Sequence, residues 1–157
     1  MFQRGPLRNN QYMTLDLAPG ATVLVEGCPY KVEEASTYYD EDFRLDIVRM
    51  SGPTPAHQRW LVAALPEPYL VLMERLAQQW LAPPQTSTLH EGDIFVSMYH
   101  GTAFRQQRGP GGRAKDGRLE YDFFRANSGR VILTLGRDEV LDTWIGTTLT
   151  PESIRLP

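Results

Sequence analysis

The segment Leu119–Leu149 constrains the fold most, because its sequence predicts three short strands joined by two tight turns. Residues 126–129 read Ala-Asn-Ser-Gly, and Asn and Gly tolerate the positive φ angles that hairpin turns need. One strand is therefore expected to end near Arg125 and the next to begin near Arg130. A second Gly-containing turn at residues 136–139 precedes the third strand. The whole segment predicts an antiparallel meander.

Composition extends this prediction to the rest of the chain. A chain of 157 residues fits one domain, and its 41% hydrophobic and 22% charged residues are typical of a globular protein. The 13 Gly and 12 Pro residues indicate many turns and few long helices. We therefore expect a mainly β fold.

No window approaches the roughly 18 consecutive apolar residues of a membrane span, and the first residues lack the apolar core of a signal peptide. A cytoplasmic location is the expectation. The single cysteine, Cys28, cannot form an intramolecular disulfide and is expected to be a half-buried turn residue. The net charge of −3 argues against a general nucleic-acid-binding protein, because such domains are usually strongly basic.

Alternating apolar residues predict further strands along the chain. In Phe43–Met50 the side chains of Phe43, Leu45 and Ile47 share one face, and the other face is expected to be wet. Residues 1–13 show no periodicity and are expected to form a loosely ordered arm. The other predicted strands are Thr14–Leu17, Ala21–Val25, Tyr30–Ala35, Arg59–Leu65, Gly92–Tyr99 and Thr102–Gln106. A turn at His100-Gly101 and a polar loop at Gln107–Gly117 separate the later strands.

The segment Tyr69–Ala82 supports two predictions. Tyr69, Leu72, Leu76 and Trp80 are among apolar residues that fall at helical spacing, and the residues between them are good helix formers. However, Tyr69–Leu72 can equally form a strand that pairs with the preceding apolar strand across a short Pro-Glu-Pro connection.

Two parts of the chain have similar patterns. Half-units at about 14–82 and 89–157, joined by a Pro- and Thr/Ser-rich connector at 83–88, match in the order of their strands and turns. A nearly constant sequence offset between the halves is what an internal duplication would leave. We therefore predict a single β-rich domain, 14–157, in which two similar antiparallel meanders pack into a sandwich- or barrel-like fold with little helix.

Several short motifs occur in an order that resembles a known family. They are Gly27-x-x-Tyr30-x-Val32, Trp60-Leu61, Gly101-Thr102-Ala103, Tyr121-Asp122-Phe123 and Trp144-Ile145-Gly146. Over Leu17–Leu156 the chain resembles the bacterial family of domain of unknown function 4178. The resemblance implies a β-rich cytoplasmic domain without assigned catalysis, sometimes encoded beside membrane-stress and polyamine-related genes. It also favours a strand at Tyr69–Arg75.

The sequence contains no recognisable catalytic or metal-binding motif. The acidic run Asp40-Glu41-Asp42 could attract Ca²⁺, but three adjacent acids on an extended chain point in different directions, which favours a solvated loop. His57, His90 and His100 are far apart, without metal-ligand spacing. We therefore predict a protein that is not an enzyme and has neither a cofactor nor a metal. Trp60 and Trp144 lie in apolar strands and are expected in the core.

A basic, glycine-rich segment, Arg105–Arg118, is the strongest candidate for a binding site. Its glycines leave the backbone free to wrap around a ligand, and its positive charge would attract a phosphate, nucleic acid, lipid headgroup or acidic protein face. The competing interpretation is a flexible hairpin tip that charge keeps soluble. The candidate partner- or anion-binding residues are Arg105, Arg108, Arg113, Lys115 and Arg118.

The sequence therefore favours a non-catalytic accessory protein that docks on a protein partner, with the resemblance implying a bacterial stress or envelope-associated system. Binding of an anion or nucleic acid through the basic segment is one alternative. A small-molecule pocket between the two half-units is the other.

Overall fold

The computed structural model describes residues 5–6, 17–54, 56–77, 86–108, 114–137 and 140–156. Nearly all of them lie in strands. The elements are β1 (Gly5–Pro6), β2 (Thr22–Val25), β3 (Cys28–Asp40), β4 (Phe43–Ser51), β5 (Gln58–Leu65), β6 (Tyr69–Arg75), β7 (Ser87–His90), β8 (Asp93–Arg108), β9 (Ala114–Ala126), β10 (Arg130–Arg137), β11 (Val140–Thr148), the 3-10 turn η2 (Pro151–Ser153) and β12 (Ile154–Leu156).

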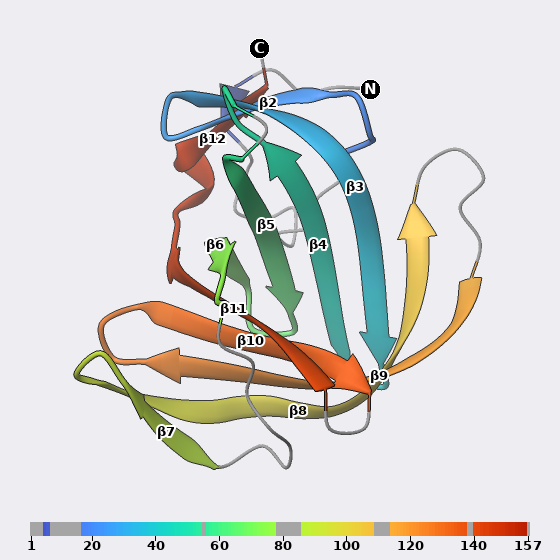
Figure 1. The fold of residues 1–157 in the computed structure, drawn as a ribbon, viewed down its shortest axis with the longest axis vertical. Coiled ribbons are helices and arrows are strands. Elements are labelled where there is room, and N and C mark those ends of the chain that lie inside the picture. Colours follow the sequence, from blue (N-terminus) through green and yellow to red (C-terminus); the bar gives the residue numbers. More distant parts are fainter. Residues whose placement is uncertain are drawn as a thin grey trace.

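The sheet closes on itself to form an eight-stranded antiparallel barrel. Strands β3–β6 form one meander and β8–β11 form another, and the two join along a β6–β11 seam and a β3–β8 seam. In Figure 1, β3, β4 and β5 run roughly vertically, whereas β8, β9 and β10 cross below them. The predicted mainly β, barrel-like fold of two meanders is confirmed, as are the strands expected within Leu119–Leu149.

Strand β8 is a continuous strand of 16 residues, so the predicted turn at His100-Gly101 is wrong. Its first part pairs with β7 and β9, and its last part bends to run alongside β3 (Figure 1). Gly101 allows the Asp40 carboxylate to approach this strand closely, because a Cβ at position 101 would lie 2.5 Å from Asp40 Oδ2. The predicted loop at Gln107–Gly117 is also shorter than expected, because β8 continues to Arg108 and β9 begins at Ala114.

Long-range pairing determines the structure of Tyr69–Arg75, for which the sequence supported both a helix and a strand. Tyr69–Arg75 is a strand, because it is held between β5 and β11, which satisfy its backbone on both sides. Residues 78–82 lie outside the described residues. Of the predicted connector at 83–88, residues 83–85 lie outside the described residues, and Ser87 and Thr88 begin β7 and pair with Val96 and Phe95.

Alternate side chains of the barrel strands point inward and form the barrel core. On β4 these are Phe43, Leu45 and Ile47, as their spacing predicts. Trp144 is also buried in this core, and the partly buried Trp60 packs against it with ring centroids 6.1 Å apart. The prediction that both tryptophans lie in the core is therefore confirmed for Trp144, whereas Trp60 is only partly buried.

The opposite face of β4 is not wet, contrary to the prediction. Val48 and Met50 lie in a second cluster on the outside of the barrel, beneath Val23 of β2 and Ile154 of β12. Asp46, on the same face, is only 1% exposed and accepts a 2.7 Å hydrogen bond from Thr37 Oγ1. Elements distant in sequence cover this face, which a local alternation pattern cannot indicate.

The β8–β11 meander has an outer cluster of its own. It contains Phe95 of β8, Phe124 of β9 and Ile132 of β10, which lie on neighbouring strands of the sheet. Within the predicted N-terminal arm, Gly5–Pro6 pair with β12, and the rest of residues 1–13, like the predicted strand at 14–16, lies outside the described residues. The duplication and its boundaries stay a prediction.

Candidate binding surface

The outer face of the β7–β8 hairpin carries a row of exposed apolar side chains, which we call the apolar row. It consists of Leu89 (71% exposed), Ile94 (65%), Val96 (48%) and Met98 (40%). Leu89 and Ile94 are direct cross-strand partners, and Val96 follows Ile94 at the alternate position on the same face. Met98 lies two residues further along β8, past the paired part of the hairpin and at an irregularity in the register between Ser97 and Tyr99. Among the described residues only two other large apolar side chains are exposed, Tyr39 and Phe104. Most exposed apolar surface is thus concentrated on one hairpin.

The hairpin also presents an open sheet edge. Strand β7 is the last strand in the sheet order, and within the described residues it pairs with β8 alone. Its residues, Ser87–His90, include no Lys, Pro or bulge, the devices that commonly protect an exposed edge from pairing. The edge of β7 therefore presents backbone hydrogen-bonding groups beside the side chains of the apolar row.

The face of the hairpin opposite the apolar row is firmly packed. Phe95 is completely buried against Phe124 and Ile132, and Ser97 Oγ donates a 2.6 Å hydrogen bond to the buried carboxylate of Asp122. The apolar row is thus the exposed side of a strand whose other side belongs to the core. Its exposure is not the result of fraying.

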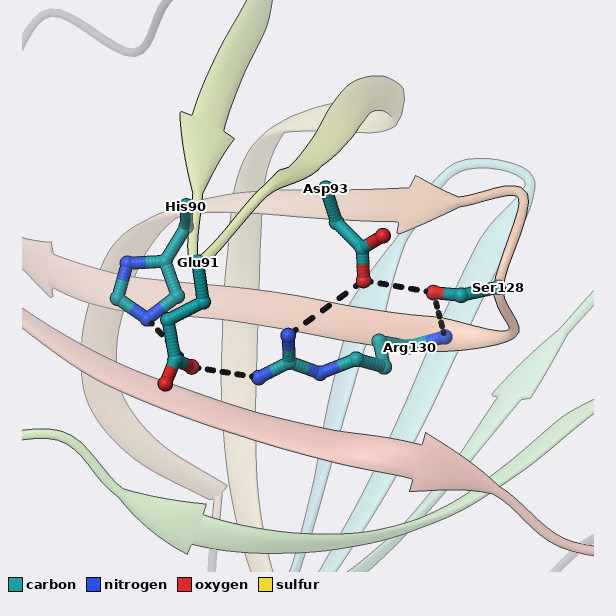
Figure 2. Close-up of polar contacts among 5 residues, drawn as sticks. All are labelled: His90, Glu91, Asp93, Ser128 and Arg130. Atoms are coloured by element: carbon teal, nitrogen blue, oxygen red, sulfur yellow. Dashed lines mark hydrogen bonds and ion pairs between the residues drawn. The ribbon is translucent and has the colours of Figure 1, made fainter.

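A polar network fixes the hairpin turn to the neighbouring β9–β10 turn (Figure 2). Arg130 donates hydrogen bonds to Glu91 Oε1 at 2.7 Å and to Asp93 Oδ2 at 3.4 Å. Ser128 Oγ donates a 2.8 Å bond to the same Asp93 oxygen, and His90 Nε2 lies 3.2 Å from Glu91 Oε1. The Arg130 guanidinium also lies over the Phe95 ring, 5.8 Å from its centroid.

The charges in this network stabilise one another. The hydrogen bond from Arg130 lowers the pKa of the Glu91 carboxyl, and the bond to Glu91 raises the pKa of the Arg130 guanidinium. Both groups are therefore ionised throughout the neutral range. Glu91 and Gly92 have φ angles of 49° and 83°, as a two-residue type I′ turn requires. The turn and the network together hold the hairpin in one orientation.

A cavity of about 310 Å³ opens at the Met98 end of the apolar row. It lies between the two meanders, where the β3–β4 turn meets the middle of β8 and Tyr121 of β9. The Tyr121 hydroxyl donates a 2.8 Å hydrogen bond to Asp40 Oδ2. Burial, followed by this bond and the Asp40 charge, raises the pKa of Tyr121, so its hydroxyl stays protonated and can donate.

The basic segment does not form one described surface. Arg105 pairs with Glu34 at 2.9 Å and also donates to Ser36 Oγ, so its guanidinium is already engaged within the protein. Arg118 is exposed and lies over the Phe104 ring, 6.0 Å from its centroid. Arg108 and Lys115 are described only as strand residues, and Arg113 lies outside the described residues. Binding at this segment stays a prediction.

The other candidate residues are dispersed. His57 lies beside Tyr30, His90 belongs to the β7–β8 turn, and His100 lines the cavity. Across residues 17–54, 56–77, 86–108, 114–137 and 140–156, no group of three or more His, Cys, Asp or Glu side chains is arranged to hold a metal ion. The structure also contains, in its described part, no helix with the length and apolar character needed to cross a membrane.

The sequence predicted the first part of β8 as a strand, Gly92–Tyr99, but did not single out the apolar row. Ile94, Phe95 and Val96 are all apolar, and a continuous apolar run does not show which face is buried. The usable signal was Leu89, an apolar residue that directly follows the predicted connector at 83–88. Its pairing with Ile94 makes the exposed face contiguous.

Comparison with known proteins identifies the family. The family model Domain of unknown function (DUF4178) matches residues 18–150, which include both meanders and the hairpin that carries the apolar row. No curated protein and no solved structure matches the chain. The chain belongs to the DUF4178 family, whose function is unknown.

Proposed function

We propose that this protein is a non-catalytic binding protein that docks on a protein partner through the apolar row. The observation that carries the proposal is the concentration of Leu89, Ile94, Val96 and Met98 on the outer face of one packed hairpin. Scattered exposed apolar residues are normal in monomers, whereas contiguous apolar surface commonly marks an interface.

The rigidity of the hairpin supports this function. The buried Phe95 and the Arg130 network hold the surface in place before any partner binds, so little side-chain or backbone ordering is needed on association. A preorganised surface binds more tightly than a mobile one of the same area. The open edge of β7 adds main-chain hydrogen-bonding groups beside the row, as in interfaces formed by strand addition.

The wider setting of the proposal comes from the family resemblance. It implies a cytoplasmic protein in a bacterial stress or envelope-associated system. The partner would then be another component of that system.

The test is site-specific photocrosslinking in the native cell, followed by measurement with the purified partner. A photoreactive residue at position 94 is expected to capture a discrete protein, and one at position 152, an exposed site on η2, is not. The purified partner should bind the Ile94→Ser variant at least about 10-fold more weakly than the wild type, as hot-spot residues do.

Phe104→Ser is the matched control, because Phe104 is a large apolar residue of β8 that is 56% exposed and lies outside the apolar row. It should leave the affinity unchanged. Equal capture from positions 94 and 152, or equal affinity for wild type and Ile94→Ser, would show that the row is not the docking surface.

A further inference from the structure

The apolar row continues directly into the cavity between the meanders. Met98 belongs to both, because it ends the row and also lines the cavity. From Ile94 to Met98 the strand advances four residues, or roughly 13 Å. A single extended segment lying along the row would therefore bring a side chain to the cavity mouth within about four to six residues.

The cavity has an acidic wall. Asp40, Glu41 and Asp42, from the end of β3 and the turn that follows, all line it. No Lys or Arg side chain in the described part of the chain forms an ion pair with any of the three. The one imidazole in the lining is that of His100. Several carboxylates of one sign in a concave site create a negative potential that attracts cations.

The rest of the lining is aromatic. Phe43 stacks between Tyr99, at 4.9 Å between ring centroids, and Tyr121, at 4.8 Å and an interplanar angle of 7°. Tyr99 is the one partly exposed ring of the three, and cation–π attraction to it would add to charge pairing between an organic cation and the carboxylates. The described carboxylates and imidazoles do not form a metal-ligand group, which argues for an ammonium or guanidinium rather than a metal ion.

We infer that the docking partner presents an extended basic segment, whose apolar side chains cover the apolar row and whose Lys or Arg side chain enters the cavity. This inference rests on the proposed function and names the chemistry of the partner. Two features select this occupant: the continuity of the row with the cavity, and the charge complementarity between its acidic wall and a basic side chain. The open edge of β7 favours an extended conformation for the segment.

The test is selection of random peptides displayed on phage against the folded protein. The enriched peptides are expected to combine apolar residues at alternate positions with a Lys or Arg about four to six positions from the first of them. A synthetic copy of an enriched peptide should bind Glu41→Gln/Asp42→Asn about 10-fold more weakly than the wild type. Its affinity for the wild type should fall with added salt, and this salt dependence should be smaller for the variant.

Glu26→Gln/Glu152→Gln is the matched control. It removes the same charge from two exposed acids near β2 and η2, outside the cavity lining, and should leave the peptide affinity unchanged. Circular dichroism and thermal unfolding check that both double variants fold.

The outcomes separate the inference from the proposed function. Selected peptides that bind Ile94→Ser as tightly as wild type would overturn both. Peptides that require Ile94 but carry no basic residue, or bind the Glu41→Gln/Asp42→Asn variant normally, would overturn the inference alone.

Two other occupants are also distinguished. Saturable binding of n-butylammonium in the cavity, without selection of any Ile94-dependent peptide, would assign the cavity to a free amine and overturn the inference. A dimer that light scattering detects for wild type but not for Ile94→Ser would assign the row to a second copy of the chain. That result would also overturn the inference.

Discussion

The hydroxyl of Tyr121 on β9 donates a 2.8 Å hydrogen bond to Asp40 Oδ2 at the end of β3, and so joins the two meanders beside the cavity. Removal of this bond by Tyr121→Phe should lower the free energy of unfolding by about 1–3 kcal/mol, since the acceptor is ionised. Urea denaturation of Tyr121→Phe, Asp40→Ala and the double variant measures the coupling. Strictly additive effects of the two changes would contradict a direct interaction.

Gly101 allows the Asp40 carboxylate to lie against β8. In Gly101→Ala the new Cβ would be 2.5 Å from Asp40 Oδ2 and 3.4 Å from the Tyr121 hydroxyl, so the hydrogen bond between them must be displaced. We expect a loss of about 1–3 kcal/mol of stability. The loss should be smaller in an Asp40→Ala background, where the clash is absent. An equal loss in both backgrounds would show that the backbone conformation, not the contact, requires glycine at this position.

The Arg130 network should control the local stability of the β7–β8 hairpin. Arg130→Ala removes the bonds to Glu91 and Asp93, and amide hydrogen exchange in β7 and its turn should accelerate about 10-fold. Arg155→Ala, at an exposed position of β12, is the control and should leave that exchange unchanged. Unaltered protection of β7 in Arg130→Ala would show that the packing of Phe95 alone orders the hairpin.

Gly146 lies at the β6–β11 seam that closes the barrel. A Cβ at this position would lie 2.7 Å from the carbonyl carbon of Leu72 and 2.8 Å from Met73 Cα, and closer still to the Leu72 oxygen. Because backbone atoms cannot move aside as a flexible side chain can, Gly146→Ala should destabilise the fold by at least about 1–3 kcal/mol. Thr147→Ala, an exposed change at the next residue, should have little effect in the same thermal melts.

Asp122 predicts an unusual pH dependence. Burial raises the pKa of its carboxyl, although the hydrogen bond from Ser97 and the charge of His100 act in the opposite direction. The folded protein then holds a proton that the unfolded chain has released, so this group stabilises the fold fully below its unfolded pKa of about 3.9. Its contribution is lost as the pH rises through the higher folded pKa.

The amide side chain of Asp122→Asn does not titrate, and its oxygen can still accept the hydrogen bond from Ser97. The stability of the variant relative to wild type should therefore increase as the pH rises from about 3 to 7. Urea melts across this range measure the difference. A difference that does not change with pH would contradict a raised pKa at Asp122.

Each meander contains a buried carboxylate that accepts a hydrogen bond from a hydroxyl, but the two pairs are not equivalent in register, because Thr37 directly opposes Asp46 whereas Ser97 opposes Phe124. Thr37 of β3 donates a hydrogen bond to the buried Asp46 of β4, and Ser97 of β8 donates one to the buried Asp122 of β9. In each meander the hydroxyl comes from the long strand and the carboxylate from the next strand. The type I′ turn at Glu91-Gly92 also has a counterpart at Glu26-Gly27, with φ angles of 50° and 80°.

The sequence by itself predicted many of the strands and some of the turns. The alternation in Phe43–Met50 and the Asn-Ser-Gly turn before Arg130 are local signals, because the pleat and the turn depend on the φ and ψ preferences of neighbouring residues. The family resemblance and the mainly β class followed from the order of such signals. Both are confirmed.

Only the tertiary structure decided which faces are buried and which residues meet. Ile94 and Phe95 are adjacent and both apolar, yet Phe95 is buried by Phe124 and Ile132 while Ile94 faces solvent. Tyr121 reaches Asp40 across 81 positions of sequence, and the cavity exists because β3 and β8 close the barrel there. Closure and burial depend on contacts between distant strands, and no local pattern contains them.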